Sequence, residues 1–126
     1  MIQNEMKKLG TLAVVGTALA SYAESIADGG KFELSGNRWV VRPDNFVTFE
    51  IHYQRTLNIA VSLRGNPCEF AEFLELPLKK GMGGYSECSI TKPCQLAAAA
   101  FYVRRAHELY QRGRSRMQKQ QTITET

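Results

Sequence analysis

The first long pattern in the sequence is helical. Apolar side chains recur at spacings of three and four residues through the first quarter of the chain: Leu12, Val15, Leu19, Tyr22 and Ile26. This spacing places them on one face of a helix. Gly29 and Gly30 follow, and glycine readily takes the left-handed conformation that ends a helix. The pattern predicts an N-terminal helix over residues 4–28.

The middle of the chain alternates between apolar and polar side chains, which is typical of β-strands. The alternation is clearest in residues 57–64, where Leu57, Ile59, Val61 and Leu63 are apolar. Four further extended runs are separated by glycine, proline or asparagine: residues 31–34, 38–42, 46–53 and 85–90. One apolar and one polar face indicate an antiparallel sheet that is covered on one side. Residues 68–74 fit either a short helical turn or another strand.

A second helical pattern follows the last predicted strand. Thr91 is a suitable N-cap residue, and Pro93 fits the first turn. The apolar stripe behind them again has helical spacing: Leu96, Ala99, Val103, Ala106 and Tyr110. We expect this helix over residues 92–112 and a polar, frayed chain from Gly113 onward. Neither helix can bury its stripe alone, so both are expected to cover the apolar face of the sheet.

The predicted fold is therefore α+β. It is a two-layer arrangement with an antiparallel sheet of about five strands and with the N- and C-terminal helices packed on one face. Leu19 and Val61 lie at the centres of their stripes and are predicted to be buried together. The 126 residues, 44% of them hydrophobic, suit one soluble domain. We assign that domain to residues 1–113 and a polar basic tail to residues 114–126.

The N-terminal segment has some features of a secretory signal. Two lysines precede an apolar run over residues 9–20, and small residues follow it. Glu5 in the basic region, and Thr11 and Thr17 in the apolar run, weigh against export. The run is also too short and too polar for a membrane span. We expect a cytoplasmic protein, with export through a signal peptide over residues 1–23 as the alternative.

The cysteines and histidines suggest no cofactor or metal. Cys68, Cys88 and Cys94 are odd in number and irregularly spaced, so we expect three free, buried thiols, with one disulfide plus one free thiol left open. Neither His52 nor His107 stands at zinc-ligand spacing from a cysteine. Asp44 and Glu50 faintly resemble a nuclease metal site, but a turn residue and a solvated strand residue are the favoured interpretation.

The net charge of +4 lies entirely in the C-terminal part of the chain. Residues 1–103 are neutral, and the excess cations follow them: Arg104, Arg105, Arg112, Arg114, Arg116 and Lys119. These side chains are candidates for phosphate contacts in nucleic acid. The favoured alternative is that they suit the negative end of a helix dipole and a solvated tail.

A glycine-rich loop is the other candidate for phosphate binding. Its residues are Lys79, Lys80, Gly81, Gly83 and Gly84. Backbone amides of such loops can cradle a phosphate. A predicted strand rather than a helix follows the loop, and the Walker spacing is missing, so a simple connection is the favoured interpretation.

The chain from Phe46 to Arg112 resembles a small uncharacterised domain of bacteria and archaea. That domain occurs alone or fused to restriction-type nucleases and to predicted transport-related proteins. The shared features are the hairpin of residues 46–64, the glycine loop, a strand, and a closing helix over residues 96–110. They cover about half of the chain. The resemblance implies the fold and, at most, an accessory role.

The functional expectation is a non-enzymatic interaction domain that associates with itself or with another protein. The polar face of the sheet and any unpaired edge strand are the expected contact surfaces. The alternative is a nucleic-acid accessory protein that acts through its basic C-terminal helix. No catalytic residue is assigned.

Overall fold

The computed structural model describes the backbone of residues 1–124 and the side chains of residues 1–113. Helical elements lie at both ends of the chain. The N-terminal ones are α1 (Ile2–Met6), the 3-10 segment η1 (Lys7–Leu12) and α2 (Ala13–Ile26). After the sheet come the 3-10 turn η3 (Pro93–Gln95) and the long helix α3 (Leu96–Thr124).

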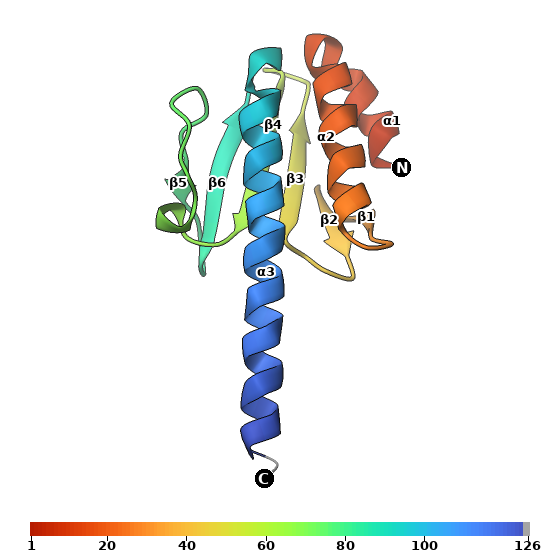
Figure 1. Cartoon of the computed structure of the whole chain (residues 1–126). Helices are drawn as coiled ribbons and strands as arrows, with labels where there is room; N and C mark the ends of the chain where they lie inside the picture. Colours follow the sequence, from red (N-terminus) through yellow and green to blue (C-terminus); the bar gives the residue numbers. More distant parts are fainter. Residues whose placement is uncertain (125–126) are drawn as a thin grey trace.

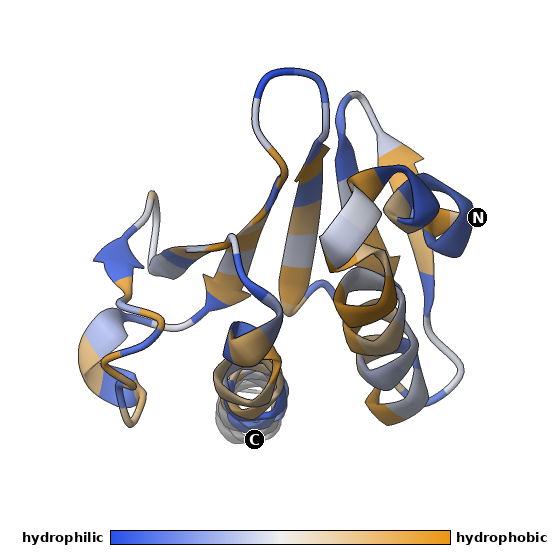
Figure 2. Cartoon of the chain, turned by 90° about the horizontal axis from the view of Figure 1, so that it is seen from above, coloured by the Kyte–Doolittle hydropathy of each residue, from blue (hydrophilic) through white to orange (hydrophobic). Residues whose placement is uncertain are grey.

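Between them lies one antiparallel sheet. Its strands are β1 (Lys31–Ser35), β2 (Arg38–Arg42), β3 (Val47–His52), β4 (Asn58–Arg64), β5 (Lys79–Lys80) and β6 (Tyr85–Ile90). Their spatial order is β1-β2-β3-β4-β6-β5. Helices α2 and α3 both lie on one side of this sheet (Figures 1 and 2). The predicted α+β fold is confirmed, with six strands because the two-residue β5 adds an edge strand.

The strand register explains why one face needs covering. Val61 in the central strand β4 stands opposite Phe49 on one side and Cys88 on the other, and all three are buried. The next row, Ser62 with Thr48 and Glu87, points to the opposite face. Side chains of a strand alternate between faces, so the apolar row faces the helices and the polar row stays uncovered.

The N-terminal helix is broken, which corrects the prediction of one continuous helix over residues 4–28. It begins at Ile2, and Gly10 interrupts it with a φ of 55° and a ψ of −116°. The break lets α1 fold beside α2 (Figure 1). Close packing there depends on Gly16, since a Cβ at this position would lie 2.5 Å from the Met6 Sδ. Glycine at both positions therefore makes the turn and the close approach possible.

The segment considered as a signal peptide contributes to the core. Ile2, Met6, Leu9, Leu12 and Leu19 are all at most 1% exposed. Within the described residues, the Ile2–Ile26 segment is long and apolar enough to cross a membrane. Core helices and signal sequences pass the same test of length and composition. Localisation in the cytoplasm stays a prediction.

The C-terminal helix is longer than the predicted range over residues 92–112. It continues through Gly113 to Thr124 and leaves the body of the protein as a projecting helix (Figure 1). A glycine inside a helix costs only about 1 kcal/mol relative to alanine, so Gly113 alone does not end it. The buried stripe is as predicted: Ala99, Val103 and Ala106 are buried, and Leu96 and Tyr110 are half-buried.

The contact between α2 and the sheet gives a first prediction. Leu19 is fully buried and Val61 is 2% exposed, within one core. Changing Leu19→Ala should lower the free energy of unfolding by roughly 2–5 kcal/mol, because it leaves a cavity under α2. Urea denaturation measures this loss. The control is Val14→Ala on the same helix, where the side chain is 80% exposed. Equal losses in the two variants would contradict this packing.

Candidate functional site

The uncovered face of the sheet is hollow at its centre. We call this hollow the sheet trough. Its floor holds small side chains, Thr48, Ala60, Ser62 and Ser89, and its volume is about 300 Å³. Long charged side chains form its rim: Arg38 and Glu50 on one side, Lys79 and Glu87 on the other. The trough is therefore an open depression with small side chains on its floor and both signs of charge on its rim.

One wall of the trough is fixed by contacts around Glu50. The Asn37 Nδ2 donates to the Glu50 Oε1 at 3.0 Å, and the His52 Nε2 lies 3.5 Å from the same oxygen. The Arg38 Nε lies 3.8 Å from the Glu50 Oε2. Glu50 and His52 therefore contact each other. Within the described residues, no three His, Cys, Asp or Glu side chains form a group that could hold a metal ion.

The β1 edge of the sheet is blocked by a side chain at Phe32. The backbone amide of Phe32 donates to the Glu24 Oε2 of α2 at 3.0 Å. The Gln3 Nε2 of α1 donates to the other carboxylate oxygen, also at 3.0 Å. The Glu24 carboxylate thus takes the place that a neighbouring strand would occupy. The opposite edge, β5, has only two residues, and both are lysines, which is a common way to limit strand addition.

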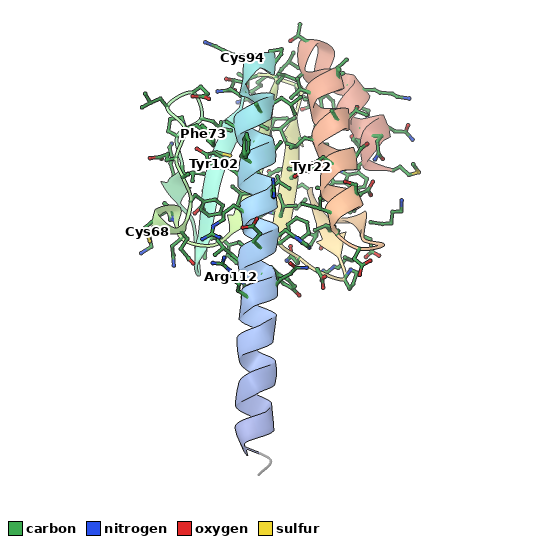
Figure 3. The ribbon with its side chains drawn as sticks, in the orientation of Figure 1. Tyr22, Cys68, Phe73, Cys94, Tyr102 and Arg112 are labelled. Atoms are coloured by element: carbon green, nitrogen blue, oxygen red, sulfur yellow. The ribbon has the colours of Figure 1, made fainter. Side chains whose placement is uncertain are left out.

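A second surface lies where the segment over residues 66–78 packs beside α3. Three α3-side residues hold the backbone of this segment. The Tyr102 hydroxyl donates to the Leu76 carbonyl at 2.7 Å and accepts from the Phe73 amide at 2.8 Å. The Gln95 Nε2 donates to the Glu75 carbonyl at 2.8 Å, and the Arg105 Nε donates to the Glu69 carbonyl at 2.9 Å. Figure 3 shows Phe73 next to Tyr102 beside the helix.

These bonds form the wall of an open depression of about 460 Å³, which we call the aromatic groove. Its lining consists of Glu69, Phe70, Ala71, Phe73, Phe101, Tyr102, Arg104, Arg105 and Glu108. The Phe73 ring lies 5.7 Å from the Phe101 ring and 5.6 Å from the Tyr102 ring. Phe101 is 57% exposed, and Leu74, next to Phe73 in the sequence, is 97% exposed. Large apolar side chains gathered in solvent commonly mark a contact surface.

Burial raises the pKa of the Tyr102 hydroxyl at the base of this groove. The hydrogen bond from the Phe73 amide lowers the pKa by a smaller amount, so the net change is upward. The hydroxyl therefore stays protonated at neutral pH and keeps its bond to Leu76. The wall of the groove has a fixed shape because the bonds to Phe73 and Leu76 share this one atom.

The basic residues of α3 proposed for nucleic acid are partly engaged within the protein. The Arg104 Nε lies 3.7 Å from the Glu108 Oε1. Arg105 holds the Glu69 carbonyl and also lies 3.2 Å from the Glu108 Oε2. Arg112 is exposed, close to where α3 leaves the body (Figure 3). Arg114, Arg116 and Lys119 lie outside the residues whose side chains are described. Arg105 is thus a structural residue, which its position in a basic run did not indicate.

The glycine loop is the turn between β5 and β6. The Gly81 amide donates to the Tyr85 carbonyl at 2.7 Å, and the Tyr85 amide donates to the Met82 carbonyl at 3.2 Å. Gly83 and Gly84 take positive φ angles of 57° and 81°. The Gly81 amide of the loop is therefore used by the hairpin itself, and Lys79 and Lys80 belong to strand β5. Phosphate binding at this loop stays a prediction without further support from the geometry.

The three cysteines are free, but only one of them is buried as expected. Cys68 and Cys94 are exposed, because each follows a proline in a 3-10 turn at the surface. Figure 3 shows them far apart, at different ends of the molecule. Burial raises the pKa of the Cys88 thiol to about 12, so this thiol is protonated at neutral pH.

Four residues of these surfaces were not predicted from the sequence: Glu24, Phe73, Leu74 and Phe101. The sequence does indicate Phe101. It lies outside the apolar stripe of α3, so its aromatic side chain is on a helix face that the sheet does not cover. The indication for Leu74 is weaker: it is a large apolar residue followed directly by a glutamate. Glu24 carried no signal, because its role depends on a contact with a residue eight positions away.

No protein-family model, no curated protein and no solved structure matches this chain. The resemblance to the small bacterial and archaeal domain therefore stays a prediction.

The closed β1 edge leads to a second prediction. Changing Glu24→Ala leaves the Phe32 amide without its charged acceptor, which should lower the free energy of unfolding by about 1–3 kcal/mol. The freed edge should also form larger assemblies than the parent protein, as measured by light scattering. Glu33→Ala on the same strand is the control and should change neither property. A Glu24→Ala variant with parental stability and mass would show that the edge is closed in another way.

A third prediction uses the pKa of Cys88. A raised pKa means that the reactive thiolate is present only far above neutral pH, at roughly one part in ten thousand at pH 8. Alkylation of the folded protein at pH 8 should therefore modify Cys68 and Cys94 and leave Cys88 unmodified until denaturant is added. Mass spectrometry counts the adducts. Three adducts formed at similar rates in the folded protein would contradict the burial of Cys88.

Proposed function

We propose that this chain is a non-enzymatic interaction domain that associates with copies of itself or with another protein. The observation that carries the proposal is the exposed Phe101 ring beside the half-buried Phe73 ring in the aromatic groove, with the exposed Leu74 next to Phe73 in the sequence. Leaving Phe101 and Leu74 in water is unfavourable, and covering such side chains supplies most of the free energy of protein association.

The sheet trough fits this role better than it fits catalysis. Its rim carries charges of both signs around a floor of small side chains, and its volume of about 300 Å³ is at the lower end for a small-molecule site. Cys88 belongs to the strand beneath the trough, but its side chain points to the covered face with Val61, and burial raises the pKa of its thiol to about 12, so it supplies no nucleophile to the trough. A polar face of this kind suits the rim of a protein contact, where water stays present.

Self-association is tested by the mass of the purified full chain as a function of concentration. The mass should rise from 14.2 kDa toward twice that value between low micromolar and near-millimolar protein. Analytical ultracentrifugation measures this directly. A mass that stays at the monomer value at the highest concentration would refute self-association, and binding to a different protein would then be the form of the proposal that is left.

A nucleic-acid accessory role is the second candidate, and one observation favours it. The helical backbone of α3 continues past Gly113 to Thr124, so the basic sequence lies on a helix that projects from the body. Arg105 is engaged with Glu69 and is not a suitable contact, so Arg112 and Arg116 are the side chains to change. Changing both to glutamine should flatten the slope of log affinity against log salt by about two units, without lowering the melting temperature. The absence of a gel shift with both DNA and RNA at low salt would rule out the nucleic-acid role.

A further inference from the structure

We propose that two copies of this chain pair through the aromatic groove, with their α3 helices running antiparallel across a two-fold axis. The inference rests on the proposed self-association and names the surface that carries it. Its partner is a second copy of this chain, and the contact residues are Phe101, Arg104 and Glu108 on α3 together with Phe73 and Leu74 on the neighbouring segment.

The groove presents its apolar side chains on a fixed framework. Phe101 projects from a helix, and Phe73 is held because the Tyr102 hydroxyl accepts from its backbone amide. Arg105 and Gln95 fix the segment on either side through the Glu69 and Glu75 carbonyls. A surface that is already ordered loses little conformational entropy when it binds, which favours association for a given apolar area.

The charges in the groove favour a second copy over a strongly acidic or strongly basic partner. Two cations, Arg104 and Arg105, are balanced by two carboxylates, Glu69 and Glu108. A balanced surface of this kind is complementary to itself. In a two-fold contact the same patch meets itself, so a cation on one copy can face a carboxylate on the other twice.

The spacing on α3 supplies that arrangement. Phe101, Arg104 and Glu108 are spaced three and four residues apart, so they form one line along the helix. When two such helices run antiparallel about an axis between residues 104 and 108, Arg104 of each copy stands opposite Glu108 of the other. The Arg104–Glu108 pair within one chain is long, at 3.7 Å, and the side chains are 64% and 43% exposed. The Arg104 side chain is therefore available to the second copy, and Glu108, which contacts Arg105 through its Oε2, offers its Oε1.

The other surfaces are less suited to a second copy. Strand addition at β1 is opposed by the Glu24 carboxylate on the Phe32 amide, and β5 is short and carries two lysines. The sheet trough is hollow and rimmed by charged side chains, so two copies placed face to face there would bury Arg38, Glu50, Lys79 and Glu87 around an unfilled space. The aromatic groove is the surface of the described residues that combines exposed aromatic side chains with balanced charge.

The test uses two charge-reversal variants of the full chain, Arg104→Glu and Glu108→Arg. Each variant alone places like charges opposite each other in the two-fold contact, so each should dimerise at least about tenfold more weakly than the parent. An equimolar mixture should recover parental affinity. In the mixed dimer one copy carries carboxylates at positions 104 and 108 and the other carries guanidinium groups at both, so opposite charges face each other twice. Ultracentrifugation measures the dissociation constants, and thermal melts confirm that each variant folds.

The apolar part of the contact is tested by Phe101→Ser, with Val14→Ser as the matched control. Both side chains are exposed on helices, at 57% and 80%, but Val14 lies on α2. Phe101→Ser should weaken the dimer at least about tenfold, and Val14→Ser should leave it unchanged. A parent that dimerises while Phe101→Ser and both charge variants retain its affinity overturns this inference and leaves the proposed self-association standing. A parent that is monomeric at all concentrations overturns both.

Discussion

The rest of the structure depends on the burial of one face of the sheet under α2 and α3. The central strand β4 sets this requirement, because Ile59, Val61 and Leu63 all point to the same face and are at most 2% exposed. Burying a side chain of this kind contributes about 1.5–3 kcal/mol, and the three lie side by side in one strand. The helices meet the sheet closely because small residues line them. Gly16 of α2 lies so near the Ile59 side chain that a Cβ there would be 3.1 Å from it.

A sheet covered on one side leaves two edges and one face in water. The two edges are protected in different ways. The β1 edge is occupied by the Glu24 carboxylate, and the β5 edge is kept short. The segment over residues 66–78 is fastened to α3 through the Tyr102 hydroxyl and its neighbours. That fastening fixes the position of Phe73 next to Phe101, and so the contact proposed for a second copy is a consequence of how the segment is held. Association is therefore expected on α3 rather than on the sheet edges.

Periodicity predicted the parts of this fold that local pattern controls. The stripes of α2 and α3 and the alternation of β4 are visible in the sequence, because a buried face repeats with the period of its element. The break at Gly10 was missed, since a glycine kink is stable only when α1 can pack against α2. Helix α3 passes Gly113 because a lone glycine is a weak stop. The aromatic groove could not be predicted either, because it needs Phe73 and Phe101, which are far apart in the sequence, to meet through hydrogen bonds made by a third residue.

Hydrogen exchange of the full chain at low and at high protein concentration tests the central claim most directly. If copies associate through the aromatic groove, amides in residues 69–76 should exchange more slowly at high concentration, because the second copy covers this segment. Amides of β1, over residues 31–35, should exchange at the same rate at both concentrations, because the proposed contact does not cover this edge and the Phe32 amide is already bonded to Glu24. Protection that appears at β1, with none in residues 69–76, would contradict the proposed contact and place it on the sheet edge instead.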